Sequence, residues 1–419
     1  MESKVEVLES SLVAPSEAAP TKVLWLSPFD LALANRGHTP LVYFYSSGAA
    51  FVDIARLKEG IAKALAAFYP FAGRLGVSDD GRAQISCNGE GALFVVARSC
   101  IKSNDLDFSK PSPELRRLFV PRVEPSSLTL AVQEWPSTTP LWTGRARSTS
   151  CRHAWSAFSR DGDGAAVEVP CHDRTLLRAR SPPVVHPDAL SVLCPKVTFS
   201  ETSGPTATEV FTISRDQLAT LERLCGGAST FCSVSALVWL CTSVVRRLPP
   251  DAETRLSFPA NVRRRVRPPL PDRYFGNALV LLGATAAARD VTSESLASVA
   301  GRISGAVARM DDELVRSAID HLELAGMDSR PLRGSMPETE LRVISWLGMP
   351  VYNADFGCGS PQVMSRAESG RGGFVYLVND GPAGHRGGGA VRVVMCMEAA
   401  NMKKLERLLY ANIATASKL

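Results

Sequence analysis

The chain has 419 residues and a formal charge of +5, with 45% hydrophobic and 21% charged residues. This length exceeds what one ordinary hydrophobic core accommodates, so two domains are expected. The apolar and charged contents are those of a globular protein and exclude global disorder. The small positive charge, without a concentrated basic stripe, argues against a nucleic-acid-binding protein.

The ten cysteines occur singly, without a CxxC pair or a regular spacing. Several lie in apolar surroundings, such as Cys232 and Cys241, which favours buried reduced thiols over a disulfide framework or a zinc site. The N-terminal stretch is charged and lacks an apolar signal region, and no run reaches the ~18 apolar residues of a membrane span. We therefore expect a cytoplasmic protein that binds neither metal nor membrane.

The first part of the chain mixes strands and helices. Between residues 51 and 68, apolar side chains such as Ile54, Ile61 and Leu65 recur at helical spacing. Strand patterns alternate or form short apolar runs bounded by turn residues. The predicted elements are, in chain order, a strand at 5–13, a turn at 28–31, a strand at 41–45, a helix at 51–68, a buried strand at 91–97 and a helical pattern at 155–158.

A second α/β pattern follows an irregular stretch at 178–208, which is rich in proline and serine and indicates a crossover between domains. Its first helix begins with the capping pattern Ser214 to Gln217. The further predicted elements are a buried helix at 234–247, a strand at 256–258, mostly amphipathic helix at 293–326, strands at 341–346, 374–378 and 391–397, and a closing helix at 402–409. We expect an α/β protein with domains at 1–180 and 209–419, joined by a linker at 181–208.

Four segments have a structural explanation singly and a functional one together. They are LSPFDL at 26–31, FYPFAGRL at 68–75, PLPDRYFGN at 269–277 and DFGCG at 355–359. Alone, they predict a turn, a helix stop, a proline-stiffened loop and a tight glycine turn. In this order and over this length they resemble the plant BAHD acyltransferases, and among these the hydroxycinnamoyl-CoA transferases. The resemblance covers nearly the whole chain except residues 134–154.

This resemblance implies two chloramphenicol-acetyltransferase-like domains with a channel between them, acting as a monomer in plant phenylpropanoid metabolism. It implies transfer of a hydroxycinnamoyl-type acyl group from coenzyme A, a co-substrate, to an amine or alcohol acceptor, with no permanently bound cofactor. The family's HxxxD motif supplies a histidine general base, a role that suits a side chain with a pKa near working pH. The oxyanion formed on the thioester needs a hydrogen-bond donor.

The chain departs from this pattern because it contains no HxxxD motif. Its six histidines are His38, His153, His172, His186, His321 and His385, and none is followed by aspartate four positions on. Residues 134–153, where the motif is expected, contain two prolines, seven serines or threonines and three arginines. We interpret this block as a shifted reading frame or a displaced splice junction. The alternative function is therefore a catalytically impaired member, or the product of a pseudogene or wrongly assembled gene without the general base.

No other histidine replaces the motif by its sequence context. His153 lies nearest the expected place and is the candidate for a displaced base. His172 precedes an acid, but the resemblance assigns the sequence Asp-Arg-Thr at 173–175 to a structural turn. His38 and His186 lie in loop contexts, His321 lies on a predicted helix, and His385 lies in a glycine-rich loop.

The dense basic cluster comprises Arg263, Arg264, Arg265 and Arg267. It is either a solvated loop with one structural salt bridge or part of a phosphate site for coenzyme A. We assign Arg263 and Arg265 to cofactor binding.

The turn at 355–359 is structural by the same resemblance, through Asp355, Phe356, Gly357 and Gly359. Asp355 is expected to pair with Arg263 or Arg265. Cys358 replaces the family's tryptophan, which costs about 3–5 kcal/mol of packing if the site is buried.

The acceptor class depends on charges upstream of the strand at 341–346. If Arg333 meets the acceptor, an anionic acceptor is favoured. If Glu338 and Glu340 line the site instead, charge complementarity favours a cationic amine. The acids lie nearer the strand, so we expect an amine.

Overall fold

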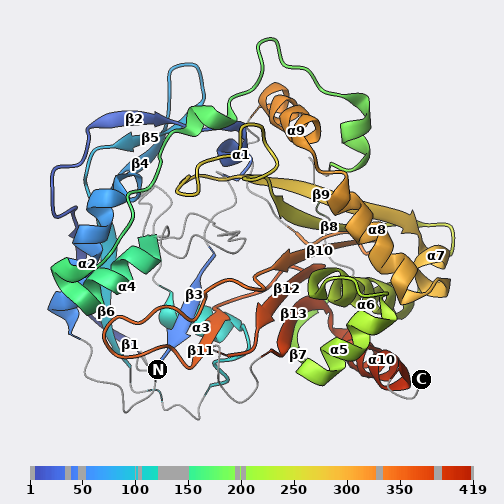
Figure 1. Ribbon diagram of the computed structural model, residues 1–419. Coiled ribbons are helices and arrows are strands. Elements are labelled where there is room, and N and C mark those ends of the chain that lie inside the picture. The colour runs from blue at the N-terminus through green and yellow to red at the C-terminus, as the bar shows by residue number, and fades with distance from the viewer. Residues whose placement is uncertain are drawn as a thin grey trace.

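The computed structural model describes residues 5–33, 39–45, 53–99, 101, 106–120, 151–193, 199, 204–326, 334–381 and 389–416. Elements from the two parts of the chain lie side by side (Figure 1). Within the described residues, no helix combines the length and apolar composition that spanning a membrane requires.

The N-terminal part contains two small antiparallel sheets and two packed helices. One sheet pairs β1 (Val5–Val13) with β6 (Ala92–Ser99), and the other has the order β2 (Lys22–Trp25), β5 (Ala83–Cys87), β4 (Arg74–Val77). Helix α2 (Ile54–Ala67) packs against α4 (Cys151–Asp161). The close approach requires Gly60, because a Cβ there would lie 2.2 Å from Ser159 Oγ. The remaining elements are α1 (Pro28–Leu31), α3 (Pro113–Phe119) and the 3-10 helices η1 (Tyr69–Ala72), η3 (Gly162–Gly164) and η4 (Arg174–Leu177).

A six-stranded mixed sheet organises the C-terminal part. Its order is β7 (Thr206–Ile213), β13 (Val391–Glu398), β12 (Phe374–Asn379), β10 (Glu340–Ser345), β8 (Glu253–Asn261), β9 (Leu279–Ala287). Strands β8, β10 and β12 run parallel to one another. The helices of this part are α5 (Arg215–Leu224), α6 (Thr230–Val245), α7 (Ala288–Ser293), α8 (Leu296–Ala308), α9 (Asp312–Ala325) and α10 (Ala399–Ala416), with the 3-10 helix η5 (Pro187–Ser191) before the sheet.

Both faces of this sheet are buried. Alternate residues such as Val343 and Leu377 belong to a large apolar core shared with α5, α6, α8 and α10. Their neighbours Ile344 and Tyr376 belong to a second cluster, which Leu41 and Tyr43 of β3 (Leu41–Phe44) also contact. Burial on both faces explains why strands such as β13 are almost continuously apolar in sequence.

One late strand crosses into the N-terminal part. Strand β11 (Val363–Arg366) pairs antiparallel with β3, with Met364 opposite Tyr43. The two halves are therefore tied by backbone hydrogen bonds as well as by side chains.

A buried cluster formed by Ser27, Asp30, Arg174 and Asn277, called here the Asp30 cluster, joins two of the four sequence motifs, 26–31 and 269–277, to the Asp-Arg-Thr turn at 173–175. Asp30 is fully buried, and Arg174 is 6% exposed. Arg174 Nη1 and the Asn277 backbone N–H donate to Asp30 Oδ1 at 2.6 and 3.0 Å. Ser27 donates to Oδ2 from its backbone N–H at 3.1 Å and from Oγ at 2.7 Å. A buried carboxylate is tolerated in this way because it is both paired and hydrogen-bonded.

Most predicted elements are confirmed, with two differences. The turn predicted at 28–31 is the one-turn helix α1, which Ser27 and Asp30 cap reciprocally. The helix predicted at 293–326 is divided, because Asp311 caps a new helix by accepting from the Leu314 N–H at 2.8 Å.

Candidate active site

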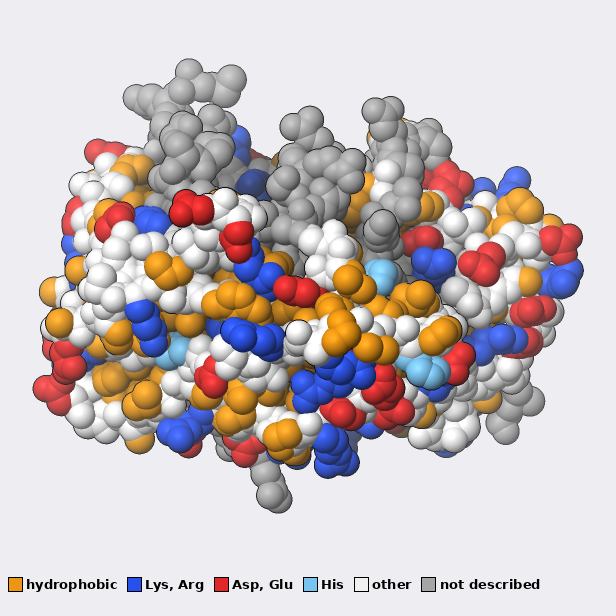
Figure 2. Space-filling view, turned by 90° about the horizontal axis from the view of Figure 1, so that it is seen from above, with side chains coloured by type: hydrophobic (Ala, Val, Ile, Leu, Met, Phe, Trp, Pro, Cys, Tyr) orange, Lys and Arg blue, Asp and Glu red, His pale blue; other side chains and the backbone are white. Residues whose placement is uncertain are grey.

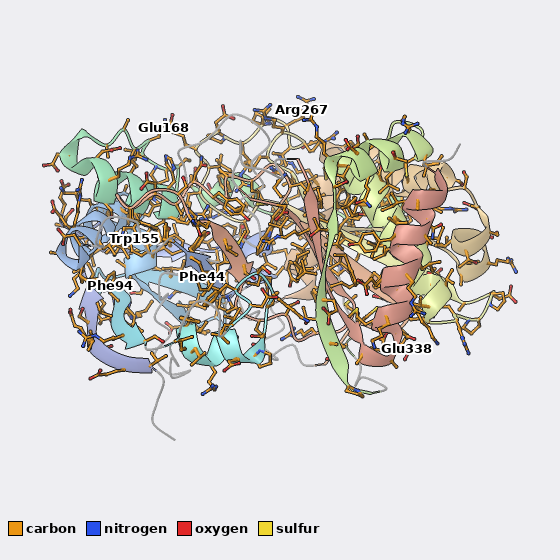
Figure 3. All side chains as sticks on the ribbon, turned by 90° about the horizontal axis from the view of Figure 1, so that it is seen from below. Phe44, Phe94, Trp155, Glu168, Arg267 and Glu338 are labelled. Atoms are coloured by element: carbon orange, nitrogen blue, oxygen red, sulfur yellow. The ribbon has the colours of Figure 1, made fainter. Side chains whose placement is uncertain are left out.

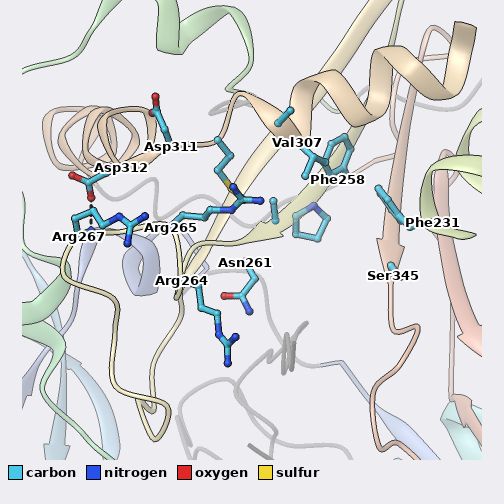
Figure 4. A pocket seen from close by; sticks show the side chains of 14 residues that line it. Phe231, Phe258, Asn261, Arg264, Arg265, Arg267, Val307, Asp311, Asp312 and Ser345 are labelled. Atoms are coloured by element: carbon cyan, nitrogen blue, oxygen red, sulfur yellow. Dashed lines mark hydrogen bonds between the residues drawn. The ribbon is translucent and has the colours of Figure 1, made fainter. Parts of the chain in front are cut away.

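A cavity of about 880 Å³ opens where β8 and β10 end. Because these strands are parallel, their carboxyl ends, Asn261 and Ser345, meet at one edge of the sheet. Ligands of open α/β sheets bind at such edges. The volume falls within the ~300–1,000 Å³ of ligand sites. The cavity is lined by Phe231, Phe258, Pro259, Ala260, Asn261, Arg264, Arg265, Arg267, Val307, Ala308, Met310, Asp311, Asp312 and Ser345 (Figure 4).

Three arginines follow β8 and form one basic wall of this cavity, called here the arginine wall. Arg264, Arg265 and Arg267 are all exposed. The Arg267 backbone N–H donates to Asp312 Oδ1 at 2.6 Å, which fixes the loop against the start of α9. Arg264 lies 3.9 Å from Asp272, an exposed pair that contributes little to stability. These guanidinium groups are therefore available for an anionic ligand.

Arg263 differs from its neighbours because its side chain turns inward. It donates to the Gly276 carbonyl oxygen at 2.8 Å and lies 5.8 Å from the centre of the Tyr274 ring. Burial lowers the pKa of its guanidinium to about 10. Of the two arginines assigned to cofactor binding, Arg265 lines the cavity and Arg263 does not. Arg263 instead supports the loop beside the cavity through its hydrogen bond to Gly276.

The described histidines lie elsewhere. His153 is on α4, where burial and the neighbouring Arg152 lower its pKa. His186 caps η5 and His321 lies on α9. Among the residues that the structure describes, no histidine lines the cavity. His38, His385 and all of 134–150 lie outside the described residues.

His172 and its neighbours have structural contacts. His172 Nε2 lies 3.0 Å from the Ala67 carbonyl oxygen, and its ring packs on Tyr69 and Phe275. Asp173 caps η4 by accepting from the Thr175 N–H at 2.9 Å. The structural turn expected for Asp-Arg-Thr is formed as predicted.

The turn at 355–359 has a different anchor from the one predicted. Asp355 Oδ1 accepts the backbone N–H groups of Gly357 and Gly359, each at 2.9 Å. Both glycines have positive φ, 98° and 86°, which other residues rarely adopt. The predicted ion pair with Arg263 or Arg265 is wrong for the described residues, since Arg263 is bonded elsewhere and Arg265 faces the cavity.

The same turn packs against α4 through Phe356. Its ring lies 4.6 Å from that of Trp155, whose Nε1 donates to the Leu57 carbonyl oxygen at 2.9 Å. Cys358, in the tryptophan position, is only half-buried, so the full packing cost of a buried site does not apply.

The two acids expected near the acceptor lie at the far end of the sheet. Glu340 begins β10 and lies 3.7 Å from Arg255, whereas Ser345, at the cavity, ends the same strand. Five residues of strand separate them by about 16 Å. Figure 3 places Glu338 and Arg267 at opposite sides of the molecule. These acids therefore do not line the cavity, and their proximity to the strand gives no support for an amine.

The surface around these features carries mixed charges. Basic, acidic and apolar side chains alternate over the face shown in Figure 2. This agrees with the small net charge and leaves the arginine wall as a local rather than a global feature.

Comparisons with known proteins identify the family. The Transferase family model matches residues 3–133 and 150–411, and the interval it leaves out lies inside the atypical segment 134–154. Putrescine hydroxycinnamoyltransferase 1 of Oryza sativa subsp. japonica is 39% identical over 453 residues, covering 98% of this chain and 99% of that protein. Shikimate O-hydroxycinnamoyltransferase of Nicotiana tabacum is 35% identical, covering 97% and 99%.

Solved structures show the same fold. Vinorine synthase matches with a TM-score of 0.72 at 19% identity, over 97% of this chain and 98% of that one. F. graminearum TRI101, complexed with coenzyme A and deoxynivalenol, matches with a TM-score of 0.69 at 16% identity, over 92% and 97%. The predicted architecture of two chloramphenicol-acetyltransferase-like domains is confirmed. The chain belongs to the Transferase family of BAHD acyltransferases, which use coenzyme A thioesters as co-substrates.

Proposed function

We propose that the chain transfers a hydroxycinnamoyl group from coenzyme A to an amine. Full-length similarity to hydroxycinnamoyltransferases supports the acyl group and favours a transferase over the impaired member. Relatives from Oryza sativa and Avena sativa are named for nitrogen acceptors, putrescine and 5-hydroxyanthranilate respectively. An alcohol is the alternative acceptor, as the shikimate relative indicates.

The arginine wall is the observation on which the cofactor part of this proposal rests. Arg264, Arg265 and Arg267 stand beside a cavity at the carboxyl ends of parallel strands. Guanidinium groups bind phosphate oxygens through paired, charge-assisted hydrogen bonds. We assign these three residues to the phosphates of coenzyme A and give Arg263 a supporting role.

The missing HxxxD motif determines the expected rate. In the reaction the acceptor nitrogen forms a bond to the thioester carbon, the carbon–sulfur bond breaks, and the nitrogen gives up a proton as the thiol of coenzyme A forms. A neutral amine is a better nucleophile than an alcohol and depends less on a general base. Without that base we expect turnover lower by about 10²–10⁴-fold than in a member that has it.

The test is an acyl-transfer assay on the full chain. Hydroxycinnamoyl-CoA is supplied with putrescine, 5-hydroxyanthranilate or shikimate, and the amide or ester is quantified by mass spectrometry. Amide formed with an amine, above the rate without protein, supports the proposal. Binding of coenzyme A with no product from any acceptor would establish the impaired alternative instead.

A binding experiment tests the arginine assignment separately. Arg265→Ala should weaken binding of coenzyme A about 10-fold, as loss of one charge-assisted hydrogen bond implies. Arg98→Ala, at an exposed arginine of β6 outside the cavity lining, is the matched control. Equal affinities for the two variants in calorimetric titration would refute the assignment.

We also propose a cytoplasmic monomer divided into two domains near residues 181–208. The eight described cysteines are free, which suits a reducing compartment. The large sheet begins at Thr206, at the end of that segment. Light scattering that gives the mass of two chains would refute the monomer.

The atypical segment requires a test at the nucleic-acid level. Sequencing the transcript across codons 130–158 shows whether a neighbouring frame encodes an aliphatic strand and HxxxD. A transcript that restores the motif predicts the full rate for that product. A transcript identical to this chain predicts the slow rate given above.

A further inference from the structure

Asp30 connects the two parts of the chain at a point outside the cavity lining. Its carboxylate takes four hydrogen bonds, from Ser27, Arg174 and Asn277, and it is fully buried. It does not line the cavity. A residue with this many partners from three segments fixes those segments relative to one another.

The loop that contains Asn277 is held closely against this carboxylate and its arginine. Arg174 lies 5.8 Å from the centre of the Phe275 ring. A Cβ at Gly276 would lie 2.5 Å from Arg174 Nη1 and 2.8 Å from Tyr274 Oη. The backbone therefore approaches the ion pair so closely that a Cβ at this position would force the Arg174 and Tyr274 side chains or the loop to shift.

The same loop continues to the arginine wall. The Gly276 carbonyl oxygen accepts from Arg263 Nη2 at 2.8 Å, and the Arg263 backbone N–H donates to Asn261 Oδ1 at 3.0 Å. Backbone hydrogen bonds between Val262 and Ala278 and between Leu270 and Arg263 close the loop at its base. From Asp30, a continuous series of contacts thus leads to the three residues that follow Arg263 at the cavity wall.

We propose that Asp30 is a positioning residue for the arginine wall: through Arg174 and Asn277 it sets the loop at 262–277, and through Arg263 it places Arg264, Arg265 and Arg267 along the cavity. This inference rests on the proposed binding of coenzyme A. Perturbation of such a contact network changes affinity by about 2- to 30-fold. The predicted effect is on binding of coenzyme A, at a site that Asp30 does not touch.

The experiment compares Asp30→Asn with a buried-pair variant at the other end of the sheet. Asn keeps the size of the side chain but replaces one acceptor oxygen by a donor. Glu398→Gln is the matched control, because Glu398 receives two hydrogen bonds from the buried side chain of Arg246, beside the start of β10. Calorimetric titration with coenzyme A and thermal unfolding are measured on both full-length variants.

Asp30→Asn is expected to weaken binding about 2- to 30-fold, whereas Glu398→Gln lowers only the melting temperature. Equal affinity in the two variants, at comparable melting temperatures, would overturn the proposal. If Asp30→Asn does not fold, Gly276→Ala provides the second test, because its methyl group disturbs the contact between the loop and Arg174 while both charges remain. Unchanged affinity in Gly276→Ala would also overturn it. Arg265→Ala separates the positioning role of Asp30 from the assignment of the cavity to coenzyme A. If Arg265→Ala leaves the affinity for coenzyme A unchanged, it is the assignment of the cavity that fails.

Discussion

His172 offers a direct link between a buried contact and the pH dependence of stability. Its Nε2 faces the Ala67 carbonyl oxygen at 3.0 Å, so the neutral ring donates there. Tyr69 and Phe275 pack against the ring. Burial lowers the pKa of His172 from its usual 6.5 to about 4, and the charges of Arg174 and Lys22 act in the same direction.

The sign and size of the effect follow from linkage between protonation and folding. Since the folded-state pKa lies below that of the unfolded chain, the unfolded state binds the extra proton between pH 6.5 and 4. Stability is full above pH 6.5 and falls as the pH decreases. One pKa unit corresponds to 1.36 kcal/mol, so His172 alone removes about 2 kcal/mol by pH 5 and about 3 kcal/mol by pH 4.

The measurement is the melting temperature of the chain and of His172→Gln from pH 7 to 5. Glutamine can still donate to Ala67 but does not titrate. With the usual unfolding entropy per residue, 2 kcal/mol corresponds to a shift of about 2–3 °C for a chain of this length unfolding as one unit. The variant should lose about that much less than the parent over the same range. Parallel curves for the two proteins would refute the argument.

Three further variants test the packing and the site. Arg174→Met leaves Asp30 charged and buried without its arginine, so the free energy of unfolding measured in urea should fall by about 3–5 kcal/mol. Adding Asp30→Asn should recover part of this loss, and a loss below about 1 kcal/mol for Arg174→Met would contradict the prediction. Gly60→Ala should destabilise the fold by about 1–3 kcal/mol although alanine favours helix, because the added Cβ would clash with Ser159. Gly301→Ala, which points into open space on α8, should instead stabilise by up to about 1 kcal/mol. Equal unfolding midpoints for the two variants would contradict this packing argument. His153→Ala should change amide formation less than about twofold, since His153 does not line the cavity, and a loss of about 100-fold would instead make it the base.

Local signals in the sequence predict the elements whose cause is local. The capping residues Ser214 and Gln217 place the start of α5 within one residue, and both side-chain hydrogen bonds are formed. The opening strand has its predicted bounds, Val5–Val13. The break between α8 and α9 could also have been found, because Asp311 precedes two further acids, Asp312 and Glu313, a typical helix start.

Features that depend on distant partners could not be found in this way. Strand β11 is short and half polar, and it is a strand because β3, far away in sequence, pairs with it. The four arginines at 263–267 look equivalent in sequence. Arg263 is distinguished by Tyr274 and Gly276, which the fold brings back beside it. Likewise, the charges of Glu338 and Glu340 suggested a ligand, but strand direction places them away from the cavity.

The pairing of β3 with β11 also restricts how the protein can form during synthesis. Residues 41–44 leave the ribosome long before residues 363–366 are made. At about 5–20 residues per second, β3 waits on the order of 16–65 s for its partner. During that interval its edge is exposed to other chains, as unpaired strands generally are. A nascent chain that stops before β11 would leave the first half unfinished, so this protein is expected to depend on chaperones more than its division into two halves suggests.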